Sequence, residues 1–318
     1  MKLSESVLHE AVLTARKRVA AWCDAHAFDY ESLAVEHIAC CNLCGWQSWD
    51  IIAIEDRYGL PARSLMCMHC GLIQTSPRMS AESYAEFYAT GAYRKIASAF
   101  YNKSIEEEIP GVQSRYANAL ITYFGDSLEE LSGGTMLDIG GSIGGISAPL
   151  AKTYGLRTTL LEPSIGEADQ VPDSISVESG MIETWDAGGR LFDVVLLIQT
   201  IDHLLDVAGS LAKIRTLLAP GGIFIVDVVD VRGIAYGNQC MISALKIDHC
   251  YGLTQHTANA YLQRAGLIPS QTYGSDDRRK VLWLCKAGEP KLDAMPDRRS
   301  VWEMHSMLLA DYKHQVTA

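Results

Sequence analysis

The feature that most limits how this chain can fold is a glycine-rich turn between a predicted strand and a predicted helix. The turn occupies residues 138–144 and has the letters DIGGSIG. Glycines at such a place let the backbone turn tightly and let the following helix point its amino end at a ligand. From Thr135 onward, short β-branched segments alternate with helical ones, which indicates a mostly parallel sheet with helical crossovers. We therefore expect an α/β domain that binds a ligand at this turn.

Seven strands are expected in this domain from their β-branched content and from the turn residues between them. They are predicted over residues 135–139, 157–162, 174–178, 191–198, 222–229, 267–273 and 279–285. Pro220, Gly221 and Gly222 are expected to end a helix and to turn the chain into the fifth strand. The predicted fold class is a Rossmann-like α/β domain with a mostly parallel seven-stranded sheet.

The spacing of the glycines does not fit a dinucleotide-binding turn. A G-x-G-x-x-G pattern that starts at Gly140 requires glycine at position 142, where this chain has Ser142. A pattern that starts at Gly141 requires glycine at position 143, where it has Ile143. The pattern acid-x-G-x-small-x-G is instead satisfied by Asp138, Gly140, Ser142 and Gly144. Glu162 ends the next predicted strand, 22 residues after Gly140, where its two oxygens can accept both hydroxyls of a ribose. A solvated acid at a strand end is the alternative for Glu162.

These residues resemble the first motif of the class I S-adenosylmethionine-dependent methyltransferases. Three later segments resemble further motifs of that family in the same order, namely residues 180–183 (GMIE), 192–199 (FDVVLLIQ) and 217–226 (LLAPGGIFIV). The resemblance implies S-adenosylmethionine as cofactor, with Met181 and Ile182 beside its adenine ring. It also places Gln199 and Tyr93 among the cofactor-binding residues.

Four of the nine cysteines form two C-x-x-C pairs separated by 22 residues, and a glycine follows each pair. The pairs are Cys41 with Cys44 and Cys67 with Cys70. Two thiolates at this spacing can bind one ion, and two such pairs complete a tetrahedron of sulfurs, so we expect a structural Zn²⁺. Cys40, next to Cys41, leaves open which cysteine of that pair binds the ion, and His69 is an alternative ligand. The alternatives to a metal site are disulfides, redox chemistry or plain buried cysteines.

A narrower resemblance extends from residue 39 to residue 287. Residues 67–78, 248–254 and 261–267 resemble methyltransferases that carry an N-terminal zinc-binding domain and act in nucleotide-sugar and surface-polysaccharide pathways, including sugar C-methyltransferases. This resemblance implies a sugar or nucleotide-sugar substrate. The C-methylating members have an aromatic residue where this chain has Lys246, so we expect methyl transfer to oxygen or nitrogen rather than to carbon.

Two histidines are candidates for the base that removes a proton from the acceptor. His203 follows the fourth predicted strand at the carboxyl edge of the sheet, where such sheets bind ligands. His249 lies after the fifth strand, between Asp248 and Tyr251. We predict His249, His203, Asp248 and Tyr251 as catalytic residues, with Asp202 and Asp248 orienting the rings. A helix cap for His203 and a core or lid position for Tyr251 are the alternatives.

We expect five regions along the chain. They are a helical extension over 1–38, a zinc-binding β module over 39–78, a helical linker or cap over 79–128, the methyltransferase domain over 129–288, and a tail over 289–318 that ends in a short helix near 302–312. The apolar periodicity of residues 5–28 indicates a packing or dimerisation helix, so a homodimer is considered among the partners.

The charge of the chain bears on its partners. With 27 Lys and Arg against 38 Asp and Glu, the formal net charge is −11, which disfavours a nucleic-acid-binding surface. Neither a membrane-spanning run nor a secretory signal is recognised. We expect a cytoplasmic enzyme with a small-molecule substrate; an RNA methyltransferase with a structural zinc module and a non-catalytic scaffold of the same fold are the alternatives.

Overall fold

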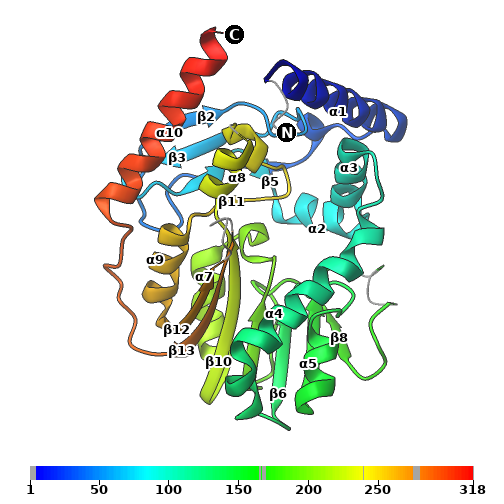
Figure 1. Ribbon diagram of the computed structural model, residues 1–318, viewed down its shortest axis with the longest axis vertical. Helices are drawn as coiled ribbons and strands as arrows, with labels where there is room; N and C mark the ends of the chain where they lie inside the picture. The colour runs from blue at the N-terminus through cyan, green and yellow to red at the C-terminus, as the bar shows by residue number, and fades with distance from the viewer. Residues whose placement is uncertain (1–4, 165, 167–169, 239, 275–279, 318) are drawn as a thin grey trace.

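The structure is a computed structural model that describes residues 5–164, 166, 170–238, 240–274 and 280–317. It has two parts stacked along its long axis, a large sheet covered by helices and a smaller sheet surrounded by helices (Figure 1). Within the described residues, no helix combines the length and apolar character needed to cross a membrane.

The large sheet has the strand order β12-β13-β10-β9-β6-β7-β8 among the described residues. Its strands are β6 (Thr135–Ile139), β7 (Arg157–Glu162), β8 (Ser176–Ser179), β9 (Phe192–Leu197), β10 (Leu218–Val229), β12 (Leu267–Gly274) and β13 (Lys280–Ala287). All neighbouring pairs from β10 to β8 are parallel, and β13 runs antiparallel to both β10 and β12. The predicted mostly parallel seven-stranded sheet is confirmed; residue 279, where the last strand was predicted to begin, lies outside the described residues.

Both faces of the large sheet are covered, which explains why the central strand β9 reads as a continuous apolar run. Val194 and Leu196 pack into the cluster that contains Leu120 and Leu150 of the helices on one face, whereas Val195 and Leu197 pack into the cluster on the other. The first face carries α4 (Ile109–Glu129) and α5 (Ser147–Tyr154), and the second carries α7 (Val207–Leu217) and α9 (Gln255–Ala265).

The smaller sheet has the order β11-β4-β3-β2, and a two-stranded ribbon β1-β5 lies with it. The strands are β1 (Val35–Glu36), β2 (Trp49–Ala53), β3 (Ser64–Cys67), β4 (Ile73–Thr75), β5 (Arg78–Met79) and β11 (Tyr251–Gly252). β11 comes from the segment after β10, so a distant part of the chain completes this sheet. Gly252 allows a close approach of the two strands there, because a Cβ atom would lie 3.0 Å from the Cβ of Ile73.

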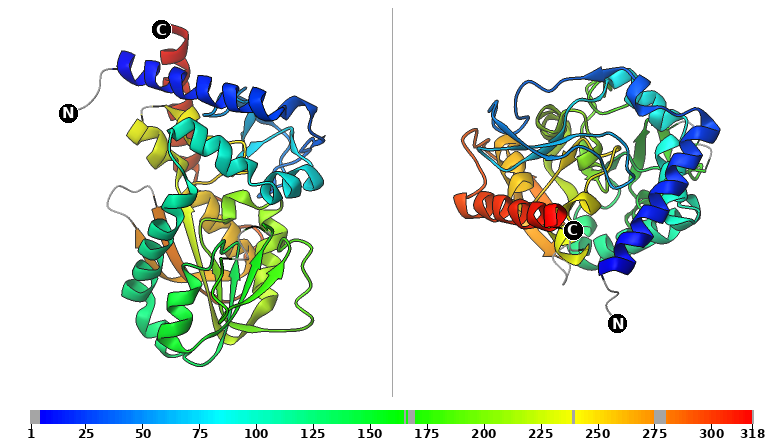
Figure 2. Two further views of the ribbon diagram at one scale, coloured as in Figure 1. Left: turned by 90° about the vertical axis from the view of Figure 1, so that its right-hand side faces the viewer. Right: turned by 90° about the horizontal axis from the view of Figure 1, so that it is seen from above.

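Helices surround the smaller sheet. They are α1 (Glu5–His26), α2 (Ala81–Ala89), α3 (Ala92–Tyr101), α8 (Val231–Asn238) and α10 (Arg298–Thr317), with short 3-10 turns η1 (Tyr30–Ser32), η2 (Glu106–Glu108), η3 (Ile201–His203) and η4 (Met241–Ala244). Ser80 caps α2 by accepting a hydrogen bond from the backbone N–H of Ser83, and the C-terminal helix is longer than predicted. Figure 2 shows α1 lying across this end of the molecule. Its exposed Val12 and Leu13 fit a dimerisation helix, and the homodimer stays a prediction.

Candidate active site

The glycine turn follows β6 and needs its small residues for steric reasons. A Cβ atom on Gly140 would lie 2.7 Å from the Thr200 side chain, and one on Gly141 would lie 2.2 Å from Asp138 Oδ2. Ser142 has φ +58°, in a region that costs a non-glycine residue of order 1–3 kcal/mol. The backbone N–H of Ser142 donates to Glu162 Oε2 at 2.8 Å, and this charge-assisted bond compensates for the strain.

Glu162 ends β7 with its carboxylate directed back to the glycine turn. The residue is 6% exposed, so the alternative of a solvated strand-end acid is not what the structure has. Besides the bond from Ser142, Oε1 accepts the backbone N–H of Ser164 at 2.9 Å. Each oxygen of a carboxylate can accept more than one hydrogen bond, so this group is chemically suited to accept ligand hydroxyls.

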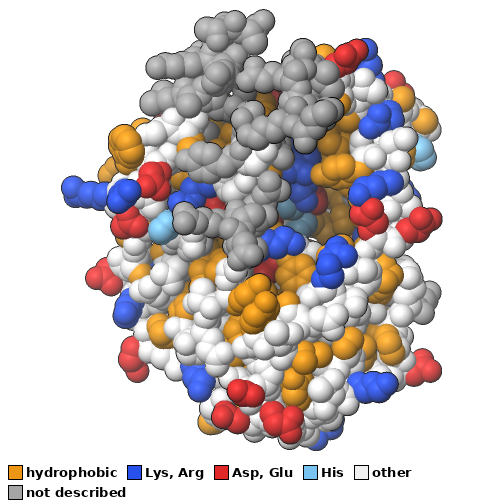
Figure 3. Space-filling model, in the orientation of Figure 1, with side chains coloured by type: hydrophobic (Ala, Val, Ile, Leu, Met, Phe, Trp, Pro, Cys, Tyr) orange, Lys and Arg blue, Asp and Glu red, His pale blue; other side chains and the backbone are white. Residues whose placement is uncertain are grey.

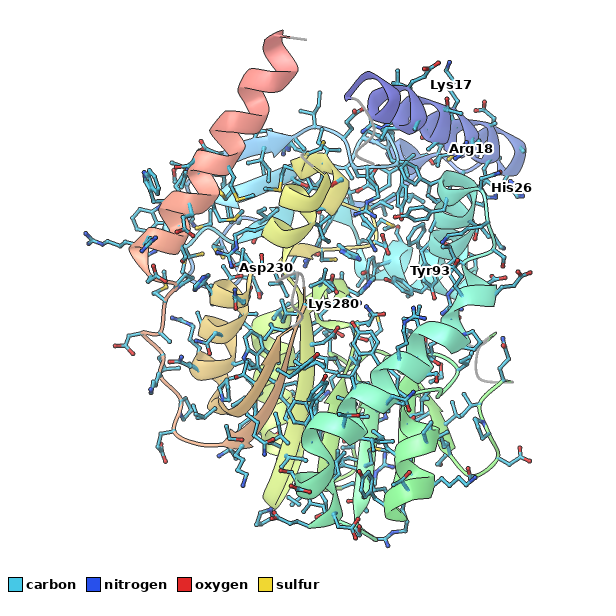
Figure 4. The ribbon with its side chains drawn as sticks, in the orientation of Figure 1. Lys17, Arg18, His26, Tyr93, Asp230 and Lys280 are labelled. Carbon is cyan, nitrogen blue, oxygen red and sulfur yellow. The ribbon has the colours of Figure 1, made fainter. Side chains whose placement is uncertain are left out.

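A cavity of about 380 Å³ opens beside this carboxylate. The space-filling view shows a hollow between the two parts of the molecule, with histidine visible in it (Figure 3). Seven of the predicted cofactor-binding residues line the cavity, namely Gly140, Ser142, Glu162, Met181, Ile182, Gln199 and Tyr93. Tyr93 is seen at the boundary between the two parts (Figure 4).

Two predicted cofactor residues, Asp138 and Gly144, do not line the cavity. Asp138 is 1% exposed and lies against Gly141, so it supports the turn from within the domain. Gly144 has φ +72° and packs against Leu160 and Ile175. Both residues shape the turn without being placed to touch a ligand in the cavity.

Asp138 contributes a pH-dependent part of the folding stability. Burial raises the pKa of its carboxyl from 3.8 to about 6, so the folded protein holds this proton more tightly than the unfolded chain. The free energy of unfolding should therefore fall as the pH rises from about 4 to about 6, by up to ~3 kcal/mol from this group. Urea unfolding of the ligand-free protein across this range should show a smaller fall for Asp138→Asn. An identical fall in both proteins would contradict the assignment.

The two histidines predicted as alternative bases lie side by side. Their ring centroids are 4.5 Å apart, and both approach Asp202, whose Oδ2 lies 3.0 Å from His249 Nδ1 and whose Oδ1 lies 3.7 Å from His203 Nε2. The Tyr88 hydroxyl forms a short hydrogen bond with His203 Nδ1. Only His203 of this pair lines the cavity. The arrangement can hold or accept a proton next to a bound ligand.

The electrostatics of this group follow from its burial. Burial, followed by the charges of Lys246 and His203, lowers the pKa of His249 well below 6.5, so its ring is neutral at neutral pH. Asp248 Oδ2 lies 3.9 Å from both His249 Nε2 and Lys246 Nζ. Tyr251 lies away from the cavity, where its hydroxyl donates to the carbonyl of Leu205 at 2.9 Å.

Three residues near the glycine turn were not predicted. Gln113 of α4 donates from Nε2 to the carbonyl of Gly141 at 3.1 Å and accepts the N–H of Gly145 at 2.9 Å. Arg94 of α3 donates to Ser142 Oγ at 3.1 Å. Glu183 lines the cavity and accepts the N–H of Leu205 at 2.9 Å. The sequence offered one signal for Gln113: it is a polar residue on the apolar face of a predicted helix.

The comparison with protein families bears directly on this fold and turn. A family model described as a methyltransferase domain matches residues 111–269, which is half of the chain. The chain belongs to this methyltransferase family. With the sheet order and the glycine turn described above, the predicted class I methyltransferase is confirmed at the level of family and fold.

Curated relatives of the methyltransferase include two proteins named ubiquinone biosynthesis O-methyltransferase. The protein from Azorhizobium caulinodans is 31% identical over 123 residues, which are 36% of this chain and 48% of the relative. The one from Methylobacterium sp. (strain 4-46) is 29% identical over 109 residues, 32% of this chain and 43% of the relative. The methyltransferase thus spans slightly less than half the length of these relatives.

A solved structure with a similar fold is that of the mitomycin 7-O-methyltransferase MmcR. It is 18% identical to the methyltransferase, with a TM-score of 0.50, and the match covers 64% of this chain and 60% of that one. At this level of identity the likeness concerns the fold.

The four cysteines of the two C-x-x-C pairs meet in one cluster of the methyltransferase. Cys41 Sγ lies 3.5 Å from Cys70 Sγ, and Cys44 Sγ lies 3.6 Å from Cys67 Sγ. A tetrahedral Zn²⁺ with bonds of about 2.3 Å places its sulfurs about 3.8 Å apart, so the cluster fits that ion. Both turns are alike, because Gly45 and Gly71 each have φ +74° and each donates to the carbonyl of the first cysteine of its pair.

Proposed function

We propose that the protein is an enzyme that transfers the methyl group of S-adenosylmethionine to an oxygen or nitrogen atom of a small molecule. The observation that carries this proposal is the buried Glu162 carboxylate, which lines a cavity of about 380 Å³ together with the glycine turn. The cofactor supplies a methyl carbon attached to a positively charged sulfur. The protein has to hold the cofactor, align the acceptor and remove a proton.

The cavity provides groups for each part of the cofactor. Glu162 accepts the two ribose hydroxyls, and Met181 and Ile182 pack against the adenine ring. Gln199, held at φ +56° after β9, lies on the side of the methionine portion. Its backbone N–H donates to the buried Asp227, which also accepts a hydrogen bond from Tyr116 at 2.6 Å, so the strand end is rigidly held. Correct alignment of two reactants can account for about 7–11 kcal/mol of a barrier.

The proposed acceptor is a hydroxyl of a sugar or of a nucleotide-linked sugar. Support comes from the resemblance of residues 248–254 to enzymes of nucleotide-sugar pathways and from the tyrosines that line the cavity, Tyr84, Tyr88 and Tyr93, since aromatic faces pack on sugar rings. The net charge of −11 does not favour an RNA acceptor. We place the reaction in the cytoplasm, because all nine cysteines lie in the described residues without a disulfide.

A phenolic hydroxyl is the second candidate acceptor. The observation that favours it is the name shared by the curated relatives, ubiquinone biosynthesis O-methyltransferase. Both candidates place the methyl group on oxygen. We also propose that the cysteine cluster holds a structural Zn²⁺; with four sulfur ligands it leaves no position for substrate.

Calorimetry with S-adenosylmethionine and S-adenosylhomocysteine tests the cofactor assignment. Methyl transfer from labelled cofactor to a panel of nucleotide-sugars, free sugars and phenols then separates the two acceptor classes. Saturable binding of both nucleosides and labelling of a panel member are the expected results. Absence of binding at millimolar cofactor by folded protein would contradict the proposed function.

His203→Ala is expected to lower the turnover number by about 10²–10⁴-fold, because removal of proton handling from a transfer step has that size. The affinity for the cofactor should stay near the wild-type value, since Glu162 and the glycine turn are unchanged. The matched control is His256→Ala, a partly exposed histidine outside the cavity, which should keep wild-type turnover. Equal turnover in both variants would show that His203 takes no part in the reaction.

A further inference from the structure

A second candidate metal site lies at the end of the cavity lined by His203. One ligand atom each from Asp202, His203 and His249 lies within 4.8 Å of the other two. We infer that these three side chains bind one divalent transition-metal ion such as Zn²⁺, separately from the cysteine cluster. Two imidazoles and one carboxylate are a ligand set found in catalytic zinc sites and in non-haem iron sites.

The distances among the three side chains suit such an ion. His249 Nδ1 lies 3.0 Å from one oxygen of Asp202, and His203 Nε2 lies 3.7 Å from the other. Ligand atoms held about 2.1 Å from a tetrahedral ion are about 3.4 Å apart. The two distances lie on either side of this value and run to different oxygens of Asp202, so a rotation of that carboxylate with small movements of the rings would admit an ion.

Surrounding groups orient the His203 ring for ligation and join the backbones of the two segments that carry the histidines. The Tyr88 hydroxyl bonds to His203 Nδ1, so Nε2 is the nitrogen on the Asp202 side. When Nδ1–H donates to Tyr88, Nε2 carries the lone pair that a metal requires. The Tyr84 hydroxyl lies 2.7 Å from the carbonyl of His203 and 2.8 Å from that of Asp248. It thus joins the two distant segments that carry the histidines.

The charge state of the cluster also favours a cation. Asp248 is 6% exposed, and within the described part of the chain its Oδ1 has no hydrogen-bond partner. Its Oδ2 lies 3.9 Å from His249 Nε2. A buried carboxylate oxygen without a hydrogen-bond partner is costly, and a nearby dication reduces that cost.

The role of this ion rests on the proposed methyl transfer. Three protein ligands would leave a coordination position open, and since His203 lines the cavity, the acceptor would reach the ion from that side. The acceptor hydroxyl would bind there and lose its proton to Asp248, whose Oδ2 lies 3.9 Å from Nδ1 of the cavity-lining His203. An oxygen electron pair then forms the bond to the methyl carbon as the sulfur–carbon bond breaks and its electron pair stays on sulfur. The proton on Asp248 passes to solvent after the products leave.

Metal content of the full-length chain tests the site without measuring activity. The wild type, Asp202→Asn, His249→Ala and the control His256→Ala are purified without chelator, dialysed against Zn²⁺ and then against metal-free buffer. We expect the wild type and the control to retain one equivalent of zinc more than the other two variants. Asp202→Asn preserves side-chain size, so it decides the question if His249→Ala does not fold. Equal zinc in folded wild type and folded Asp202→Asn would overturn the inference.

Cofactor binding on the same samples separates this inference from the proposed function. Loss of one zinc equivalent from Asp202→Asn with unchanged affinity for S-adenosylhomocysteine is the expected result. If the wild type binds the cofactor and transfers methyl groups but retains no more zinc than Asp202→Asn, the metal site is overturned. The proposed methyltransferase function would still stand. In that case the imidazole of His203 acts as the base itself.

Discussion

Cys67→Ser is expected to release the Zn²⁺ proposed for the cysteine cluster and to unfold the smaller sheet. Cys67 is fully buried at the end of β3, and metal binding at structural zinc sites contributes about 10–16 kcal/mol to folding. The same core cluster contains Cys41, Cys70 and Phe87 of α2, so the wall of the cavity that carries Tyr84 and Tyr88 should be lost with the ion. Zinc analysis should find one equivalent fewer, and limited proteolysis should cut the N-terminal third.

The matched control is Cys40→Ser. Cys40 is adjacent to the cluster in sequence, yet it is exposed and its sulfur is not part of the cluster. This variant should keep the zinc content and the protease resistance of the wild type. Equal zinc content in Cys67→Ser and Cys40→Ser would show that the cluster does not hold the ion.

Glu162→Ala is expected to weaken binding of S-adenosylmethionine by at least about 100-fold. Each hydrogen bond to a charged acceptor contributes about 1.5–3 kcal/mol, and the carboxylate is expected to accept two from the ribose. The change in melting temperature should be small by comparison, because Ser142 lines the cavity and water there can accept the N–H that it donates to Glu162. Calorimetry and thermal unfolding of the same protein measure both effects.

Two further variants serve as controls for this result. Glu162→Gln keeps the size and one acceptor oxygen, so its affinity should be intermediate. Glu178→Gln alters an acid on the neighbouring strand β8 that pairs with Arg190 and lies outside the cavity, and should bind the cofactor normally. Unchanged affinity in Glu162→Ala would remove the ribose assignment on which the proposed function depends.

The glycine turn and the seven strands could be predicted because their determinants are local. The β-branched segments, the Pro220–Gly222 turn and the acid at the end of β7 each carry their signal within a few residues. The cysteine pairs are similar, since the two-residue spacing already brings both thiolates of each pair to one side of a turn. The boundary of β10 was less well predicted: the strand begins at Leu218, four residues early, through a bulge between Leu218 and Ile223.

The histidine cluster shows where prediction from the sequence stopped. His203 and His249 were treated as competing candidates, whereas the structure places them in contact around Asp202. Gln113 was not predicted at all, although it bonds to the glycine turn on both sides. Both findings depend on residues that are far apart along the chain, for which a single sequence contains no periodic or spacing signal.

The sequence by itself determined the α/β class, the glycine turn and the two cysteine pairs, because backbone preferences, short β-branched runs and ligand spacing act over short stretches of chain. Only the tertiary structure decided that β11 completes the smaller sheet beside β4 and that the segment before it carries His249 to His203. The pairing of β11 with β4 joins residues 177 and 179 positions apart, Tyr251 with Gln74 and Gly252 with Ile73. Its stability comes from burial and hydrogen bonds that exist only after the chain has folded.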